Sequence, residues 1–586
     1  MKKLLSGNEA IALGAYESGV KVAAAYPGTP STEILENLAK YPGLWAEWSP
    51  NEKVALDVAI GAAYAGQRAL ATMKMVGLNV AADSLFYVAY TGLVGGLVIV
   101  TADDPGMHSS QNEQDNRQYA RFAKVPMVEP SDSQECKDFV GYALDISERF
   151  DAPVLLRTTT RVAHSQTAVE VEERSGPQGD GEPKSYKRDK AKYVMVPGYA
   201  RARHPVVEQR LKDLAEFAET FEGNRIEWGS PDLGIISGGI AYQYAREVFK
   251  DASFLKLGMS YPLPERKIKE FASKVKRLLV VEDLDPFWEE QVRLMGVEVE
   301  GKKYFPMIGE FSPDVVRAGA VKAGLMEEKA LAPVELPELP GRPPILCPGC
   351  RHRGVFFVLS KLKAVVNGDI GCYALGVNPP LAAVDTTGCM GASFGVVHGV
   401  NKAGIVERAV GVLGDSTFFH SGIAPLINIV YNGSNSTTII LDNHTTAMTG
   451  HQENPGTGRT LLGEPTDAID IENLVRAIGV KDVRVVDPYD LKAVEAALKG
   501  AFATEGPSVI IATGPCVLKT REKRGVIVVD GERCNGCGLC LRVGCAAVVR
   551  ASDKLVRIDE LQCTGCTLCM QTCARKAMSL VEQGGR

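Results

Sequence analysis

The sequence lacks the surplus of basic residues that marks many nucleic-acid-binding proteins. Its 65 Lys and Arg residues are outnumbered by 71 Asp and Glu residues, which gives a formal net charge of -6 and a pI near 5.9. This balance provides no electropositive surface for DNA or RNA. We therefore expect no nucleic-acid partner.

The sequence also has little that would carry it into or across a membrane. Its start, MKKLLSGNEAIA, has two lysines but no apolar core of signal-peptide length. One run of 18 residues, 85–102, contains no charge. Because it includes Gly92, Gly95 and Gly96, we interpret it as a helix end, a glycine turn and a buried strand rather than a membrane span. We expect a cytoplasmic protein.

Cysteine, in contrast, is abundant. There are 14 cysteines, and without a secretory signal they argue against a disulfide scaffold and favour metal or redox chemistry. The 586 residues are 45% hydrophobic and 23% charged, which is enough for three or four domains with substantial cores.

Helical and strand patterns alternate over the first 160 residues. This alternation is typical of an α/β fold, in which a parallel sheet carries helices on both faces. The pattern predicts helices at 8–17, 31–39 and 52–65, and strands at 21–26, 69–73, 97–101 and 153–157.

Composition predicts where one domain ends and the next begins. A charged, glycine-rich stretch from residue 169 to about 192 is expected to be a solvated linker, and a helix is predicted at 206–219. Gly238 and Gly239 follow a strand pattern without a full glycine fingerprint, so they predict only a helix start. The predicted units are an α/β domain at 1–170, a linker and helical connection at 171–230, a smaller α/β domain at 231–330, a proline-rich linker at 331–345, a third α/β domain at 346–522 and a cysteine-dense tail at 525–586.

The stretch from 411 to 450 carries the motif around which the rest of the chain is interpreted. It predicts a strand at 409–413, a helix near 418–430 and a strand at 437–441. Asp415 and Asn443 follow the two strands, and the carboxyl ends of parallel strands face one crevice. Two hard oxygen ligands at a helix start suit a magnesium-bound pyrophosphate. The alternative is that either residue merely caps a helix.

The spacing of this motif resembles that of thiamine diphosphate (ThDP) enzymes. Those enzymes have Gly-Asp-Gly followed about 25 to 30 residues later by Asn, and here Ser416 stands in place of the second glycine. The resemblance implies that Mg²⁺ is bound by the Asp415 carboxylate, the Asn443 amide and the backbone carbonyl of Thr445. Gly414 and Ser416 would complete the cofactor-binding turn.

The tail contains two cysteine triplets. Three cysteines two residues apart wrap one corner of an iron-sulfur cubane, and in two-cluster bacterial ferredoxins a fourth cysteine ligates the other cluster. Paired zinc sites, the alternative, favour separated cysteine pairs. A four-residue gap before Cys545, and Ala546 and Ala574 where proline is usual, depart from the ferredoxin pattern. We expect one [4Fe-4S] cluster on Cys534, Cys537, Cys540 and Cys573, and a second on Cys545, Cys563, Cys566 and Cys569.

Four more cysteines, Cys347, Cys350, Cys372 and Cys516, lie beside Gly or Pro at predicted loops of the third domain. Lone cysteines often serve as small buried hydrophobes, and we interpret Cys136 and Cys389 in that way. In order along the chain, CPGC, GDIGC, the ThDP motif and GPC resemble the 2-oxoacid:ferredoxin oxidoreductases. That resemblance implies that the four cysteines hold a third, proximal [4Fe-4S] cluster.

The first half of the chain carries the same resemblance more specifically. Four segments look like the large (alpha) subunits of indolepyruvate:ferredoxin oxidoreductases: AYPGTPSTEILE at 25–36, WSPNEKVALDVAIGAA at 48–63, MKMVGLNVAADSL at 73–85 and DDPGMHSSQNEQDNR at 103–117. The resemblance implies several doubly wound ThDP-type domains: a pyrimidine-binding domain at 1–170, a transketolase C-terminal-like domain at 231–330 and a diphosphate-binding domain at 346–522. A small α+β two-cluster ferredoxin domain of bacterial type would follow.

The resemblance also assigns residues in the first domain. Glu52 would hold N1′ of the aminopyrimidine; a first-turn Glu behind a Ser49 or Asn51 cap is the alternative, and both interpretations can hold together. Thr29 would contact substrate, although with Pro30 it also suits an N-cap followed by a first-turn proline. His108, in a polar loop with Ser109, Ser110 and Gln111, is able to orient a carboxylate, and an ordinary hydrated loop is the alternative.

Two further histidines, His444 and His451, flank the magnesium turn. Each is able to assist proton transfer, but we favour a structural hydrogen bond for both.

The implied function is oxidative decarboxylation of arylpyruvates, indolepyruvate foremost, with CoA. The products would be aryl-acetyl-CoA, CO₂ and reduced ferredoxin. No segment corresponds to the domain that closes the active site in related single-chain enzymes, which implies a separate smaller beta subunit and a heteromer. Alternatives are a non-oxidative ThDP-dependent decarboxylase that releases an aldehyde, and an electron-relay subunit without thiamine.

Overall fold

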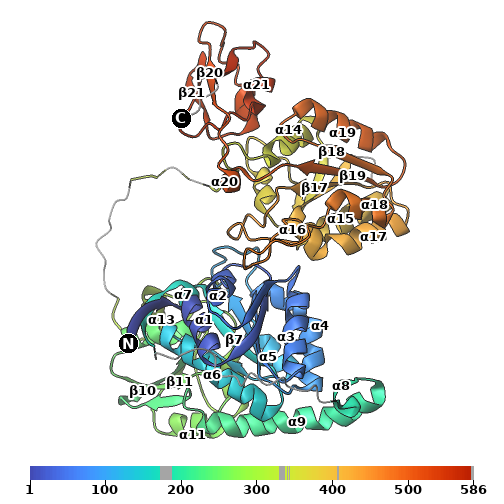
Figure 1. Cartoon of the computed structure of the whole chain (residues 1–586). Coiled ribbons are helices and arrows are strands. Elements are labelled where there is room, and N and C mark those ends of the chain that lie inside the picture. Colours follow the sequence, from blue (N-terminus) through green and yellow to red (C-terminus); the bar gives the residue numbers. More distant parts are fainter. Residues whose placement is uncertain (172–187, 329–336, 340, 342, 405–407, 582–586) are drawn as a thin grey trace. The chain divides into compact units, whose positions relative to one another are not determined.

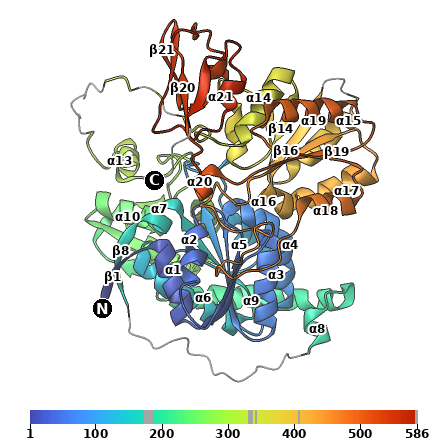
Figure 2. The same cartoon turned by 45° about the horizontal axis from the view of Figure 1, so that its top comes forward.

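The computed structural model describes all residues except 172–187, 329–336, 340, 342, 405–407 and 582–586. The chain forms two compact units, Met1–Glu335 and Leu336–Arg586, and their elements can be followed in Figures 1 and 2. Parts of both predicted linkers, within 171–230 and 331–345, fall outside the described residues. Among the residues that are described, no helix is both long and apolar enough to cross a membrane.

The first unit is built on a seven-stranded sheet in the order β12-β6-β7-β5-β4-β2-β3, parallel except for the β12 edge. Helices α3 and α4 cover one face, and α1 and α6 cover the opposite face (Figure 1). The strands are β2 (Val20–Ala25), β3 (Trp45–Trp48), β4 (Arg68–Lys74), β5 (Leu97–Asp103), β6 (Met127–Val128), β7 (Val154–Thr159) and β12 (Met259–Tyr261). The helices are α1 (Gly7–Glu17), α2 (Thr32–Leu38), α3 (Glu52–Tyr64), α4 (Met75–Thr91), α5 (Arg117–Ala123), α6 (Ser133–Phe150) and α7 (Thr160–His164).

These elements confirm the α/β prediction for the first 160 residues. Strands β5 and β7 are continuously buried, and β4 is buried after Arg68, as expected of parallel strands covered on both faces. The uncharged run at 85–102 is the end of α4, a turn at Gly92 and strand β5, as predicted. An antiparallel pair, β1 (Lys2–Ser6) and β8 (Gln166–Glu170), is added to the unit, and α8 (Lys190–Tyr193) and α9 (Pro197–Thr220) follow.

A second, four-stranded sheet lies within the same unit, in the order β13-β10-β11-β9. The helix start predicted at Gly238 and Gly239 is confirmed, because α10 begins at Gly239. Its strands are β9 (Arg225–Glu227), β10 (Ser230–Gly238), β11 (Ala252–Leu257) and β13 (Leu278–Val281), and its helices are α10 (Gly239–Val248), α11 (Glu265–Ser273), α12 (Phe287–Leu294) and α13 (Pro313–Lys322).

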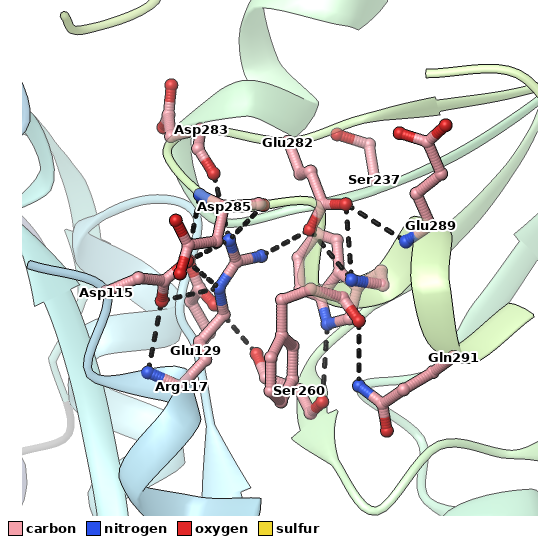
Figure 3. Close-up of polar contacts among 12 residues, drawn as sticks. Asp115, Arg117, Glu129, Ser237, Ser260, Glu282, Asp283, Asp285, Glu289 and Gln291 are labelled. Atoms are coloured by element: carbon pink, nitrogen blue, oxygen red, sulfur yellow. Dashed lines mark hydrogen bonds and ion pairs between the residues drawn. The ribbon is translucent and has the colours of Figure 1, made fainter. Parts of the chain in front are cut away.

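The two sheets of the first unit are joined by a buried ionic network. Arg117 at the start of α5 donates to Glu282 Oε2 at 2.7 Å and to the carbonyl of Asp283 at 2.8 Å, both beyond β13 (Figure 3). It also donates to Asp115 Oδ2 at 2.5 Å. The Arg117, Asp115 and Glu282 side chains are at most 1% exposed. Strand β12, which follows β11, completes the connection by pairing with β6.

The second unit contains a six-stranded parallel sheet in the order β15-β14-β16-β17-β19-β18. Its strands are β14 (Val365–Gly368), β15 (Thr386–Thr387), β16 (Ala409–Gly414), β17 (Thr437–Asp442), β18 (Asp482–Val486) and β19 (Ser508–Thr513). Its helices are α14 (His352–Leu362), the 3₁₀ turn η1 (Cys372–Val377), α15 (Ala392–Lys402), α16 (Asp415–Thr417), the π turn η2 (Phe418–Gly422), α17 (Ile423–Tyr431), α18 (Ile471–Ile478), α19 (Leu491–Ala503) and α20 (Val517–Thr520).

The tail forms two short antiparallel pairs, β20 with β23 and β21 with β22. Its elements are β20 (Val526–Val529), the 3₁₀ turn η3 (Leu539–Val543), β21 (Val548–Ser552), β22 (Leu555–Ile558), α21 (Leu568–Gln571) and β23 (Met578–Val581). Half-buried and buried cysteines, among them Cys540, Cys563 and Cys569, are part of its core. This small module therefore depends on its cysteines for packing.

Candidate functional site

Asp415 and Asn443 meet at the carboxyl edge of the second unit's sheet. Strands β16 and β17 pair in parallel, with Gly414 opposite Leu441, so the residues that follow them leave from one edge. Asp415 is 4% exposed and Asn443 is 9% exposed. One amide atom of Asn443 lies 3.1 Å from Asp415 Oδ1 and 2.7 Å from the carbonyl oxygen of Thr445.

This geometry fits a magnesium ion. If the amide nitrogen occupies that position, it donates to both oxygens; if the amide oxygen occupies it, three oxygens converge. Neighbouring oxygens around octahedral Mg²⁺ lie about 3 Å apart, because each is about 2.1 Å from the ion. The Asn443 amide atom is thus spaced from an Asp415 oxygen and from the Thr445 carbonyl oxygen as neighbouring magnesium ligands would be.

The second oxygen of Asp415 is held from the protein side. Asp415 Oδ2 accepts from the Thr445 backbone N–H and from Asn454 Nδ2, both at 3.1 Å. Burial, reinforced by the nearby Asp442 carboxylate, raises the pKa of Asp415 to about 7. A bound divalent cation would offset that cost by favouring the ionised form.

The chain after Asp415 does not continue directly as an α-helix. A single π turn, η2, separates Asp415–Thr417 from α17. Such turns are common where a helix borders a functional site. Ser416, which replaces the usual glycine, is 8% exposed, and its hydroxyl accepts from Thr446 Oγ1 at 2.8 Å. The substitution is accommodated because this hydroxyl has a partner.

The two histidines near the turn differ in their surroundings. His444 Nε2 lies 3.0 Å from Thr513 Oγ1 and 3.2 Å from Asp442 Oδ2, and hydrogen bonding to Asp442 raises the pKa of His444. His451 has a buried Nδ1 without a partner among the described residues. His444 therefore has the structural bond that we favoured, and His451 faces the cavity described next.

Cys347, Cys350, Cys372 and Cys516 line one cavity, which they share with Asn443 and His451. The Cys516 backbone N–H donates to the carbonyl of Asn443 at 3.0 Å, so a cysteine turn lies directly against the candidate magnesium turn. Burial raises the pKa of Cys350 to about 12 and that of Cys372 to about 11. Buried thiols grouped in this way fit a site in which iron would hold them as thiolates.

The eight tail cysteines line two further cavities. One is lined by Cys545, Cys563, Cys566 and Cys569, together with Gly349 and Arg353 from the part of the second unit that contains the six-stranded sheet. The other is lined by Cys534, Cys537, Cys540 and Cys573. Among the described residues, no three Cys, His, Asp or Glu side chains converge on a single metal ion. A cubane is larger than one ion, so its ligands need not converge on a point.

The first unit holds the other residues predicted to act. Glu52 is 5% exposed in the first turn of α3, behind an Asn51 cap that accepts from the Val54 N–H at 2.9 Å. A Cβ at Gly77, in α4, would lie 2.8 Å from Glu52 Oε1, so only glycine leaves room for this carboxylate. The capping role is confirmed for Asn51 and coexists with a buried Glu52.

The helix start predicted at Thr29 and Pro30 is wrong. Helix α2 begins at Thr32, and Ser31 precedes it without a side-chain cap. Asn8 Nδ2 donates to the Pro30 carbonyl at 2.7 Å, so a contact from α1 holds this turn in place of a local cap. Thr29 is half-buried in the turn.

The loop that contains His108 is tied down internally. Asp104 Oδ2 accepts from the Ser109 N–H at 2.8 Å and from Ser110 Oγ at 2.6 Å, and Lys74 Nζ donates to the Ser109 carbonyl at 2.6 Å. His108 Nε2 lies 3.0 Å from Glu310 Oε2. These bonds order the loop, while His108, Ser109 and Gln111 remain exposed to solvent. Lys74, a charged residue at the end of the apolar strand ATMK, was a signal that the sequence analysis missed.

The two lone cysteines differ. Cys136 is fully buried in α6, as predicted. The prediction that Cys389 is a small buried hydrophobe is wrong, because Cys389 is exposed. It lies in the turn between the two-residue edge strand β15 and α15.

Comparison with known proteins places the chain among relatives. A family model described as "Thiamine pyrophosphate enzyme, C-terminal TPP binding domain" matches residues 369–512, and one described as "Pyruvate flavodoxin/ferredoxin oxidoreductase, thiamine diP-bdg" matches residues 13–220. Indolepyruvate oxidoreductase subunit IorA of Archaeoglobus fulgidus is 43% identical, and the alignment covers 94% of each chain. The chain belongs to the IorA family.

Other IorA proteins show the same extent of similarity. That of Pyrococcus horikoshii is 41% identical, over 100% of this chain and 97% of its own length. A solved 2-oxoglutarate:ferredoxin oxidoreductase from Magnetococcus marinus is 17% identical, with a TM-score of 0.46 over 56% of this chain and 65% of its own. As an IorA family member with both thiamine-binding matches, the chain is part of a ThDP-dependent 2-oxoacid:ferredoxin oxidoreductase.

Proposed function

We propose that this IorA family member is the large subunit of an enzyme that converts arylpyruvates, indolepyruvate foremost, and CoA into aryl-acetyl-CoA and CO₂. The two electrons released would reduce ferredoxin. The observation that carries the proposal is the cavity in which the four thiols of Cys347, Cys350, Cys372 and Cys516 meet Asn443. A non-oxidative decarboxylase has no use for four thiols against its cofactor turn.

Residues of both units have proposed roles in holding Mg²⁺ and the cofactor. Asp415, Asn443 and the Thr445 carbonyl would hold Mg²⁺ and, through it, the cofactor's diphosphate, with Gly414 and Ser416 forming the turn. Glu52 would hold a proton at N1′ of the aminopyrimidine. Thiamine diphosphate, when bound, supplies the carbanion chemistry that releases CO₂ from a 2-oxoacid.

In the first unit, His108, Thr29 and Lys74 are proposed for the substrate side. Lys74 is buried and cationic, and burial lowers its pKa while Asp104 opposes that shift. A cation fixed at the sheet edge, with His108 in the loop that it holds, suits a substrate carboxylate.

The cysteine sets suggest a path for single electrons. The Cys545 set lies against the Cys347 turn, whereas the Cys534 set includes the exposed Cys537. Iron-sulfur clusters, three in this proposal, pass electrons one at a time. The order of thiols therefore runs from the buried cofactor turn to the surface, where ferredoxin would bind. A smaller beta subunit is the proposed partner, as the relatives' designation as a subunit suggests.

The proposal is tested on protein purified without oxygen together with its partner subunit. Bound thiamine and iron are counted, and a panel of 2-oxoacids is then assayed with CoA for ferredoxin reduction and for aldehyde. We expect about twelve iron atoms per chain, four for each of three clusters, and CoA-dependent ferredoxin reduction that is fastest with arylpyruvates. Aldehyde without ferredoxin reduction would support the non-oxidative alternative, and a preparation without thiamine would support a relay subunit.

A further inference from the structure

Arg353 lies in the first turn of α14, three residues after Cys350, and is 1% exposed. Its guanidinium reaches two cysteine turns at once. On one side, Nη2 donates to the carbonyl of Leu346 at 2.6 Å and to that of Cys347 at 3.0 Å. On the other side, Nη1 donates to the carbonyl of Val543 at 3.2 Å and, at a shorter distance, to that of Gly544.

This cation has no anionic partner among the described residues. It forms no ion pair there, and its Nε has no hydrogen-bond partner. Burying a guanidinium among neutral carbonyls costs free energy unless negative charge lies nearby. Arg353 lines the cavity of Cys545, Cys563, Cys566 and Cys569, and it also donates to the carbonyl of Cys347 at 3.0 Å. Its charge therefore lies beside both cysteine sets.

The two turns are also in direct contact beside Arg353. Gly349 has φ +70°, and a Cβ there would overlap Thr564 Oγ1 in the CTGC turn. Tyr489 donates its hydroxyl to the Gly349 carbonyl at 2.5 Å, and Gln571 Nε2 donates to the Tyr489 carbonyl at 2.7 Å. The turn of Cys347–Cys350 and that of Cys563–Cys566 are thus held back to back.

We propose that Arg353 is a positioning residue for electron transfer: its fork fixes the separation of the Cys347 and Cys545 cluster sites, and its charge raises the reduction potential of both. The inference rests on the proposed iron-sulfur function. Arginine suits this role because its planar fork bonds both turns and keeps its charge when buried. A nearby positive charge favours the more negative, reduced form of a cluster.

The test uses the full chain with its partner subunit, purified without oxygen, and needs no 2-oxoacid or CoA. Potentials are measured by redox titration with electron paramagnetic resonance. In Arg353→Gln the potentials of the two inner clusters should shift to more negative values. The outer cluster of the Cys534 set, whose cavity does not include Arg353, should keep its potential. Arg353→Lys keeps the charge but cannot bond all four carbonyls. Its inner-cluster potentials should therefore stay closer to the wild-type values than those of Arg353→Gln, while the magnetic interaction between the inner clusters should weaken.

Arg210→Gln provides a matched control. Arg210 is 4% exposed and donates to the Asp151 carbonyl at 2.6 Å and to the Ala89 carbonyl, in the first unit. It should leave every potential unchanged. The proposal would be overturned if Arg353→Gln kept both the wild-type cluster potentials and the wild-type magnetic interaction between the inner clusters. If that variant loses iron, an unchanged interaction in Arg353→Lys would overturn it. Wild-type protein with about eight iron atoms would instead count against the proposed cofactor set.

Discussion

At the scale of single residues, the buried Asp415 has one oxygen held by two hydrogen-bond donors and the other 3.1 Å from an amide atom of Asn443. Replacing it by asparagine keeps the shape and the bond from the Thr445 N–H but removes the charge that a cation needs. We expect Asp415→Asn to weaken magnesium-dependent thiamine diphosphate binding by roughly ten- to a hundredfold or more.

The measurement is a titration of the cofactor-depleted protein at fixed Mg²⁺. Ser416→Gly, which restores the residue usual at that position, is the control and should bind as the wild type does. Wild-type affinity in Asp415→Asn would remove this carboxylate from the proposed magnesium site.

A second prediction at this scale concerns the thiols. Cys350→Ser should remove about four iron atoms per chain, one cluster's worth, while bound thiamine remains. The exposed Cys389 gives a control of the same chemistry, because Cys389→Ser should leave the iron content unchanged. Iron and thiamine counts on anaerobic protein check both, and full iron in Cys350→Ser would contradict the proximal cluster.

The position and exposure of a single residue could be predicted where a local sequence pattern determines them, and not where long-range contacts do. Asp415 and Asn443 were predictable because buried parallel strands are apolar runs whose ends are visible in the sequence. The Thr29 helix start failed because a contact from Asn8 overrode a local capping pattern. The exposure of Cys389 depends on packing around a two-residue strand, and no local pattern records that.

At the scale of elements, helices α3 and α4 pack so that Glu52 lies over Gly77. We expect Gly77→Ala to displace the carboxylate and to reduce turnover at least tenfold while Mg²⁺ and thiamine still bind, because misplacement by about 1 Å is costly in catalysis. Steady-state rates and thiamine content measure the two effects separately.

Gly61, on α3, supplies the matched control, since a Cβ there meets nothing within 4 Å. Gly61→Ala should keep full turnover and add up to about 1 kcal/mol of stability, as expected for alanine in a helix. If Gly77→Ala retained wild-type turnover, the proposed role of Glu52 would need another explanation.

At the scale of the whole molecule, the first unit depends on charges brought together from distant sequence. Arg117 and Glu282 are 165 residues apart and pair at 2.7 Å (Figure 3). Neither this pair nor the addition of β12 to the first sheet was predictable, because no local pattern encodes such long-range partners. The α/β class itself was predictable from the alternation of helices and strands.

Removing the Arg117 guanidinium should strongly destabilise the folded state. Arg117→Gln would leave Asp115 and Glu282 buried without it, at a cost of roughly 3–5 kcal/mol in the free energy of unfolding. Denaturant unfolding measures the loss. The exposed pair of Arg266 and Glu216 is the control, and Arg266→Gln should unfold as the wild type does. Equal midpoints for the two variants would contradict a structural role for the network.

The same network predicts a pH dependence. Burial raises the pKa of Asp283 to about 6, so the folded state keeps a proton that the unfolded chain, with a pKa near 3.8, has lost. The contribution of Asp283 to stability is therefore present at low pH and is lost as the pH rises through about 6.

Asp283→Asn removes this titration while keeping an oxygen for the Phe311 N–H. Between pH 7.5 and pH 5, the wild type should gain about 1 kcal/mol of unfolding free energy relative to the variant. Parallel pH profiles for the two proteins would contradict the shift.

The hydrogen bond from the Cys516 N–H to the Asn443 carbonyl has a practical consequence for anyone who handles this protein. One backbone contact makes the loop proposed to bind the diphosphate and the loop that bears the Cys516 thiol share their rigidity. If the proposed proximal cluster is present, preparations stripped of their vitamin-derived cofactor should therefore bleach faster in air than saturated ones, and adding it back before storage should prolong their brown colour.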